Sequence, residues 1–415
     1  MEKYVLKDLI SVKRGMSLSG EYYSTEGDLI RLTLGNFQEE GGFKINTSKD
    51  DLYFTGPVKD EFILAEGDII TPLTEQVVGL LGATARIPES GKYIQSGDVA
   101  LIKCISDKID DGYCYYLISS DVVRKQLSAA AQQTKIRHTS PEKIMDCEVF
   151  IPEVKEQRKV AKLLDGINKK IELNNKINDN LAQYANMIYD YWFTQFDFPD
   201  SKEKPYKSSG GAMTFSSVLG KDIPIGWNVV PLGNIAKMCT ESITPQAGTI
   251  YKHYSIPAFD DSKLPKIEDG AEIDSSKYLV PSNTILVSKL NPQFKRIWFV
   301  NEADNTSICS TEFLPFCNYG VPVEYLHGVL NSAAYHKYMI QCSSSSTGSR
   351  KRMPPELCLT YNVVFPPISV MEAYSNKLRS VLEHMSNLLY ENASLKATRN
   401  HLLPLLMSGQ ATIAD

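Results

Sequence analysis

The chain has 415 residues, 22% of them charged and 43% hydrophobic, and its formal net charge is −5. This length predicts two or three domains, and the composition is that of a folded globular protein rather than a disordered one. A mildly acidic chain cannot hold nucleic acid through its overall field, so any such binding must come from local cationic surfaces. No apolar run approaches the ~20 residues of a membrane span, and no targeting pattern is present, so we expect a cytoplasmic protein that has no membrane partner.

Residues 1–152 predict an α+β domain. Short strand-like runs are separated by Gly, Pro, Asn and Asp, and one helix is expected from Gly112 onward. A polar, basic loop and a final strand then lead into Pro152. The expected buried stripe of the helix contains Tyr116, Ile118, Val122, Val123 and Leu127.

Residues 153–195 read as one long helix, because apolar residues recur at alternating spacings of four and three, the a and d seam of a heptad pattern. Residues 367–408 repeat the pattern without a gap, and Pro152 aligns with Pro366. The residues expected to pair the helices are Leu164, Ile167, Ile171, Asn174, Leu181 and Ile188 in the first, and Leu378, Val381, Met385, Asn392, Leu395 and Leu402 in the second.

The two seams predict an antiparallel coiled coil within the chain. In the register that we expect, Asn174 faces Asn392 and Leu164 faces Leu402, while Arg399 lies opposite Ile167 in a weak layer. A buried polar pair can specify such a register. A helix of about 36 residues would measure roughly 54 Å, enough to hold two domains one to one and a half DNA turns apart.

Between the helices, residues 196–227 lose periodicity and gain Pro, Gly and Ser, which predicts a surface linker. Residues 228–366 then repeat the plan of the first domain with little identity, and residues 409–415 form a short tail. The chain is therefore expected to alternate two globular domains with two long helices, one scaffold carrying two different readers.

Catalytic and metal-binding patterns are weak. Asn291-Pro292-Gln293-Phe294 resembles the Asn-Pro-Pro-Tyr/Phe turn of amino-methyltransferases, but Gln293 replaces the second proline and no glycine-rich turn precedes it. No phosphate-binding GxxxxGK[ST] loop and no CxxC pair occur. We expect no catalytic residue, no metal, no cofactor, and reduced rather than disulfide-bonded cysteines.

The more informative residues lie in the polar loop before the last strand of each domain. Such loops combine cations for phosphates with groups that can pair with base edges, although flexible solvated turns have a similar composition. The candidate DNA contacts are Gln132, Gln133, Thr134, Lys135, Arg137 and His138 in the first domain, Ser345, Thr347, Ser349, Arg350, Lys351 and Arg352 in the second, and, as weaker candidates, Arg31, Lys289, Lys295 and Arg296.

The helix beginning IPEVKEQRKVAKLLDGINKK, the phrases YDYWFTQFDFP, KPYKSSGG and IPIGW, and the ending HLLPLLMSGQA together resemble the specificity (S) subunit of type I restriction-modification systems. The resemblance covers essentially the whole chain. It implies a non-enzymatic reader of double-stranded DNA whose two target-recognition domains bind the halves of a split, asymmetric site. It also implies docking of two methyltransferase subunits on the helices, with two restriction subunits joining them in a restriction complex.

Two other readings of the sequence remain open: a coiled-coil assembly protein whose domains bind other proteins, and a degenerate DNA methyltransferase. The sequence does not reveal the DNA target, the gap between its halves or the base edges that each loop reads.

Overall fold

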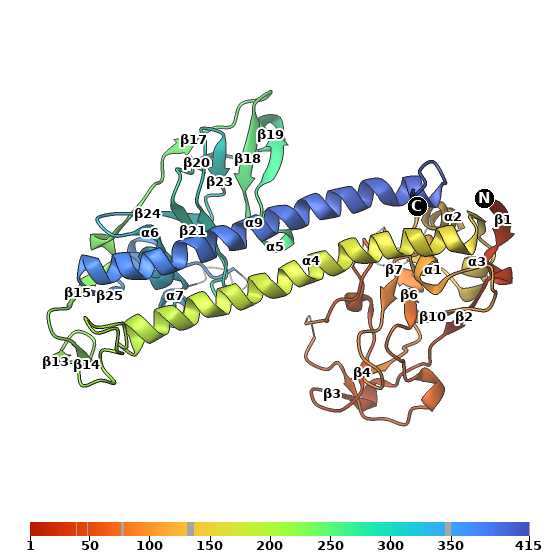
Figure 1. Cartoon of the computed structure of the whole chain (residues 1–415), viewed down its shortest axis with the longest axis horizontal. Coiled ribbons are helices and arrows are strands. Elements are labelled where there is room, and N and C mark those ends of the chain that lie inside the picture. The colour runs from red at the N-terminus through yellow and green to blue at the C-terminus, as the bar shows by residue number, and fades with distance from the viewer. Residues whose placement is uncertain (39, 48, 76–78, 131–136, 345–349, 415) are drawn as a thin grey trace. The chain divides into compact units, whose positions relative to one another are not determined.

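The computed structural model describes residues 1–38, 40–47, 49–75, 79–130, 137–344 and 350–414. The chain divides into two compact units, Met1–Lys170 with Leu395–Asp415, and Ile171–Ser394. Each unit contains one globular domain and part of both long helices, α4 (Val154–Tyr189) and α9 (Ile368–Met407) (Figure 1). None of the helices in the described part of the chain is both long and apolar enough to span a membrane.

The domain of the first unit is built on an antiparallel sheet with the strand order β2-β10-β6-β8, and β1 pairs with β12 beside it. A second sheet has the order β3-β5-β4-β9. The elements are β1 Glu2–Val5, β2 Ile10–Arg14, β3 Tyr23–Ser24, β4 Ile30–Arg31, β5 Tyr53–Phe54, β6 Ile69–Pro72, β7 Thr74–Glu75, β8 Ala85–Arg86, β9 Tyr93–Ile94, β10 Val99–Cys104, α1 Asp111–Ile118, α2 Asp121–Ala130, β11 Arg137–His138, α3 Pro141–Met145 and β12 Glu148–Ile151.

The second unit repeats this plan. Its main sheet has the order β16-β24-β21-β22, β15 pairs with β25, and a second sheet has the order β17-β20-β23-β18-β19. The elements are β13 Met213–Ser216, β14 Lys221–Pro224, β15 Asn228–Pro231, β16 Ala236–Met238, β17 Ser242–Ile243, β18 Ile250–Tyr254, α5 Ile256–Asp261, β19 Lys266–Asp269, β20 Lys277–Leu279, β21 Thr284–Ser288, β22 Ile297–Val300, β23 Ser307–Cys309, β24 Phe313–Asn318, α6 Val323–Asn331, α7 Ala333–Cys342, α8 Pro355–Cys358 and β25 Asn362–Phe365.

The main sheets of the two units correspond strand for strand. In both units, two helices and then one short helix lie between the same two strands along the chain: α1, α2 and α3 between β10 and β12, and α6, α7 and α8 between β24 and β25. The α+β class and the tandem plan expected from the sequence are therefore present. The second sheets differ in strand number and order, which is where two readers on one scaffold would be expected to diverge.

The single helix expected from Gly112 is wrong, because two helices, α1 and α2, meet at Ser119 and Ser120. Ser120 Oγ donates to the Leu117 carbonyl at 2.6 Å, and Ser119 Oγ donates to the Tyr116 carbonyl at 3.1 Å. Serine side chains compete in this way with the helical hydrogen bonds of the backbone. After the break the helix face turns, so that Val122 is exposed instead of buried.

The segment expected as a surface linker, 196–227, contributes side chains to the main hydrophobic core of the second unit. Strands β13 and β14 form a hairpin, and Phe196, Phe198 and Trp227 are buried. The ring of Phe198 stacks on Trp227 at 4.9 Å between centroids and on Tyr206 at 4.7 Å. Aromatic packing of this kind is not visible as a periodic pattern in the sequence, which is why the segment resembles a linker.

The expectation that all cysteines are reduced is wrong for one pair. Cys239 and Cys317, 78 residues apart, form a disulfide where the end of β16 lies beside β24. Antiparallel pairing of these strands brings the two cysteines together, and no sequence spacing reports that contact. The other cysteines are free thiols, and burial raises the pKa of Cys147 to about 11.

Within the second unit, the parts of α4 and α9 that belong to it lie side by side (Figure 1). Asn174 and Asn392, 0% and 6% exposed, meet between them. Asn174 Nδ2 donates to Asn392 Oδ1 at 2.9 Å and to Glu391 Oε2 at 2.8 Å, while Asn392 Nδ2 donates to Asn175 Oδ1 at 2.8 Å. The asparagine contact expected from the heptad register is present.

In the first unit, the hydrogen bonds of Arg399 account for an arginine at a seam position where an apolar residue is usual. Its guanidinium donates to Asn168 Oδ1 at 3.0 Å and to the carboxylate of Glu40 at 2.5 Å, and its side chain is only 12% exposed. An arginine at a seam position thus becomes a polar link between α9 and the loop that carries Glu40, because its long side chain reaches out of the seam.

Candidate nucleic-acid interface

The candidate loops of both domains join equivalent ribbons. In the first unit, β11 pairs with β7, and the Thr139 amide donates to the Leu73 carbonyl at 2.9 Å. In the second unit, a bridge joins Leu290 to Arg352, and the Met353 amide donates to the Lys289 carbonyl at 3.0 Å. In each domain, the segment that follows a central strand of the main sheet, β6 or β21, therefore pairs with the end of the polar loop. We call this paired arrangement the ribbon, and it occurs once in each domain.

The structure describes only the ends of the two predicted loops. Gln132, Gln133, Thr134 and Lys135 in the first loop, and Ser345, Thr347 and Ser349 in the second, lie outside the described residues. They stay predictions. The described ends of the loops, which carry Arg137, His138 and Arg350 to Arg352, form the ribbons.

Arg137 has an internal partner. Its Nη1 lies 3.0 Å from Oε1 of the buried Glu75, and its Nη2 donates to the Ser128 carbonyl at 2.7 Å. The other oxygen of Glu75 accepts three backbone N–H groups, from Gly79, Leu80 and Leu81, at 2.8 to 2.9 Å. The Arg137–Glu75 pair therefore holds the ribbon together. Beside it, His138 is the exposed member of the described pair of β11 residues and can meet a ligand.

Arg31 is placed unfavourably for a DNA contact. It is 7% exposed, its guanidinium carbon lies 3.8 Å from the centroid of the Tyr23 ring, and its Nη2 donates to Asp51 Oδ1 at 3.1 Å. A buried arginine that is stacked and paired in this way stabilises its surroundings. We therefore leave Arg31 out of the proposed interface.

The ribbon of the second unit is more cationic at its surface. Arg350, Lys351 and Arg352 are exposed. Lys289 is half-buried and lies on the segment that pairs with the one carrying these residues. Arg352 forms a two-pronged contact with Glu312, with Nη2 to Oε1 at 2.7 Å and Nε to Oε2 at 3.1 Å. The hydrogen bond from Arg352 lowers the pKa of Glu312, so this carboxylate stays ionised. Arg350 and Lys351 are the exposed cations of this ribbon outside that pair.

Lys295 and Arg296, the other two weak candidates, brace the adjacent turn. Arg296 binds both oxygens of Asp260, at 2.6 and 2.8 Å, and its side chain is 15% exposed. Lys295 donates to the Asn331 carbonyl, and burial lowers its pKa. Both side chains are occupied within the protein, so neither presents a free charge to a ligand.

Sequence reasoning missed the partners that define these roles. Glu75, Asp260 and Glu312 are ordinary surface-type residues in the sequence, and only folding brings each one to its arginine. Asn291 resembles part of a methyltransferase motif in the sequence, but in the structure its side chain accepts the Lys351 amide at 3.0 Å, and its own amide donates to the Lys351 carbonyl at 2.7 Å. It fastens the turn to the ribbon.

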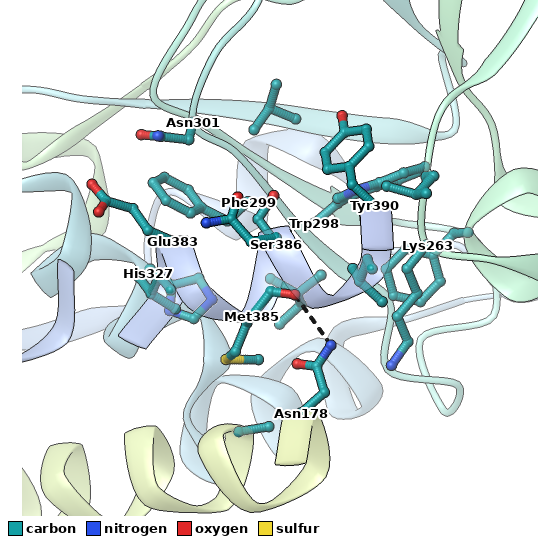
Figure 2. A pocket seen from close by; sticks show the side chains of 18 of the residues that line it. Asn178, Lys263, Trp298, Phe299, Asn301, His327, Glu383, Met385, Ser386 and Tyr390 are labelled. Atoms are coloured by element: carbon teal, nitrogen blue, oxygen red, sulfur yellow. Dashed lines mark hydrogen bonds between the residues drawn. The ribbon is translucent and has the colours of Figure 1, made fainter. Parts of the chain in front are cut away.

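A separate cavity of about 770 Å³ lies in the second unit between the domain and the two long helices (Figure 2). Its walls include Trp298, Phe299 and Tyr390, with Asn178 and His327 among the polar groups. Burial, and then the positive charge of Lys295, lower the pKa of His327 to about 4, so the ring is neutral at pH 7. The described residues contain no group of three or more His, Cys, Asp or Glu side chains that could hold a metal ion.

The low pKa of the half-buried His327 predicts that the fold is sensitive to acid. In the unfolded chain a histidine titrates near 6.5, while in the fold the pKa of His327 is about 4, so only the unfolded state takes up the proton between these values. The stability that depends on neutral His327 is complete above pH 6.5 and is lost as the pH falls toward 4, by on the order of 2 kcal/mol. Urea unfolding of His327→Gln at several pH values should show a correspondingly shallower acid loss than wild type. His401→Gln, which removes an exposed histidine, is the control, and equal acid slopes for H327Q and wild type would contradict the assignment.

The chain is similar to known proteins. Residues 1–183 match the family model of the type I restriction modification DNA specificity domain. Residues 1–183 belong to that family. The resemblance seen in the sequence motifs is thereby confirmed, and the first ribbon lies inside this specificity domain.

The similarity extends beyond the specificity domain. The type I restriction enzyme MjaIX specificity subunit of Methanocaldococcus jannaschii is 23% identical over 324 residues, 74% of this chain and 71% of that protein. The HindI specificity subunit of Haemophilus influenzae is 19% identical over 321 residues, 63% of this chain and 68% of that protein. The chain is thus related to type I specificity subunits over most of its length.

A solved structure shares the fold. The crystal structure of the type I restriction-modification S subunit from M. genitalium has a TM-score of 0.59 at 13% identity, and the match covers 98% of this chain and 96% of that one. At this identity the likeness concerns the fold alone.

Proposed function

We propose that the chain is the DNA-specificity subunit of a type I restriction-modification complex, with no catalysis of its own. The observation that carries this proposal is the ribbon built twice, once in each domain, from the end of a polar loop and the chain after a central strand. A motif repeated on one scaffold with different side chains suits a protein that reads two different half-sites of one duplex.

The half-sites are proposed to be unlike because the ribbons are unlike. The first offers His138 beside an internally neutralised Arg137, and the second offers Arg350 and Lys351 beside the Arg352–Glu312 pair. Arginine and lysine contact phosphates and guanine edges, whereas a histidine ring offers two nitrogen atoms for hydrogen bonds. We therefore expect the second domain to contribute the larger share of the electrostatic affinity.

The long helices are proposed to pair as an antiparallel coiled coil that sets the gap between the half-sites. Support comes from the Asn174–Asn392 hydrogen bond and from the seam, since every residue predicted for helix pairing is buried or half-buried. The 36 residues of α4 correspond to a rod of roughly 54 Å. A rigid rod of this length would keep the two DNA-contacting ribbons a fixed distance apart, and so fix the spacing of the half-sites along the DNA.

The same helices are proposed to dock two methyltransferase subunits in the cytoplasm, with two restriction subunits joining to form the restriction complex. A stripe of exposed apolar residues along α4 supports docking, because its members follow heptad-like spacing on a face that the seam leaves free. The stripe contains Leu173, Tyr184 and Met187 of α4, which are 52%, 44% and 69% exposed, and it continues to Tyr191, 36% exposed, in the helical turn Asp190–Thr194 that follows α4.

The proposal is tested by co-expressing the full chain with the methyltransferase subunit of its own system and mapping the methylated positions in the host DNA. We expect one split sequence with two different halves and a constant gap, and a gel shift of that duplex that weakens with salt. Absence of DNA binding with the methyltransferase present would overturn the proposal and favour an assembly protein. Methyl transfer by the chain alone would show that it is catalytic.

A further inference from the structure

The turn from Asn291 to Phe294 beside the second ribbon is held rigidly. Asn291 has a φ of 47°, a left-handed conformation that asparagine tolerates better than most residues. The Phe294 amide donates to the Asn291 carbonyl at 2.9 Å, which closes the turn. His336 Nε2 lies 2.7 Å from the Pro292 carbonyl oxygen, and the two hydrogen bonds between Asn291 and Lys351 tie the turn to the ribbon.

Phe294 is 58% exposed at the end of this turn. The two residues that follow it are anchored, Lys295 to the Asn331 carbonyl and Arg296 to Asp260. The guanidinium carbon of Arg296 lies 5.4 Å from the centroid of the Phe294 ring. Keeping a phenylalanine ring in water forgoes the free energy of burying it, of about 2 kcal/mol. What distinguishes Phe294 from other exposed apolar residues is that its turn is braced and is hydrogen-bonded to the cationic ribbon.

The neighbourhood of this ring suits nucleic acid better than protein. Arg350 and Lys351 belong to the segment that Asn291 binds, and Lys289 precedes the turn by two residues. Cations on a ribbon next to an exposed aromatic ring match the combination that holds a phosphate backbone while a ring stacks on a base. An apolar protein partner would instead require further exposed apolar side chains, and the residues next to Phe294 in the turn are Gln293 and Lys295.

We propose that Phe294 stacks on a nucleobase in the half-site read by the second domain, entering the duplex as a wedge at one base step. This inference rests on the proposed DNA-specificity function. The contact would not identify a base by hydrogen bonds, because every base has a π face. It would favour a step that unstacks readily, such as a pyrimidine–purine step, and so add sequence preference through the deformability of the DNA.

The test uses the full-length chain together with the methyltransferase subunit of its own system, and duplexes that the wild-type complex selects from a random-sequence pool. Phe294→Ala is expected to weaken binding of the selected duplex about 5- to 150-fold, the range for loss of one base–aromatic stack. The dependence of affinity on salt should stay the same, since no charge is removed. Phe294→Tyr should keep most of the affinity. Phe215→Ala, which removes a phenylalanine that is 67% exposed on β13, should bind as wild type does.

A second measurement reports the stacking itself. A 2-aminopurine placed at successive positions of the selected half-site should brighten at one step with the wild-type chain and stay dim with F294A. If F294A binds and brightens the probe as wild type does, the wedge is overturned while the DNA-specificity function stands. If the wild-type chain, with the methyltransferase subunit present, selects no duplex, both are overturned.

Discussion

Replacing Arg350 and Lys351 together by alanine should lower DNA affinity about 30-fold at 0.15 M salt and reduce the slope of log affinity against log salt by about 1.8. Both side chains are exposed at the end of the second loop, and neither belongs to the Arg352–Glu312 pair. Each phosphate contact that a cation makes releases about 0.9 of a counterion, so losing two contacts acts on affinity and on salt dependence together. Titrations of a labelled duplex at several salt concentrations measure both quantities.

A matched control separates a local contact from the loss of net charge. Lys202 and Lys204 are exposed lysines of the same unit, in the segment before β13, and K202A/K204A removes the same charge. We expect its affinity and salt slope to stay close to those of wild type. Equal losses in the two double variants would mean that only the overall charge matters, and the ribbon would then no longer be a specific interface.

Leucine at either Asn174 or Asn392 should destabilise the second unit by about 1 to 3 kcal/mol, because the remaining buried amide loses its partner in the facing seam position and keeps only its second hydrogen bond, to Glu391 or to Asn175. Leucine at both positions should recover most of that loss, since two apolar residues can pack in the seam without unpaired polar groups. The double variant is expected to lose the preference for one register that a buried asparagine pair provides. Urea unfolding of the four proteins in the cycle measures the coupling, expected at about 0.5 to 3 kcal/mol.

Asn178 provides the control for this cycle. It lies in the same seam but donates to the Met385 backbone carbonyl at 3.2 Å rather than to a side chain. The cycle formed by N178L and N392L should therefore be additive within a few tenths of a kcal/mol. Additivity in the Asn174 and Asn392 cycle as well would argue that the observed hydrogen bond does not couple the helices.

The sequence does not show which cationic residues of the candidate interface are already paired within the fold. Arg31, Arg296 and Arg350 are alike in the sequence, yet the first is buried on Tyr23, the second is bound to Asp260, and the third is exposed. Arginine acts as a ligand-binding group only where no carboxylate of the fold is already in reach. Asp51 and Asp260 are separated from their arginines by 20 and 36 residues, so no local pattern reports these pairs.

The break between α1 and α2 was within reach of the sequence, because two adjacent serines after a helical stretch are a recognised way to end a helix. The hairpin within 196–227 was harder to foresee. It depends on Phe198, Tyr206 and Trp227 stacking over distances along the chain that periodicity does not sample.

Periodicity and repetition were enough to determine the two long helices, the tandem α+β plan and the expected contact between Asn174 and Asn392, because a heptad seam is a local property that repeats along the chain. The family resemblance likewise rested on motifs in contiguous stretches. Only the tertiary structure decided which cations are free, that Asn291 fastens a turn to Lys351, and that Phe294 is displayed on it. Those features depend on contacts between residues far apart in the chain, and such contacts form only when the sheets bring the residues together.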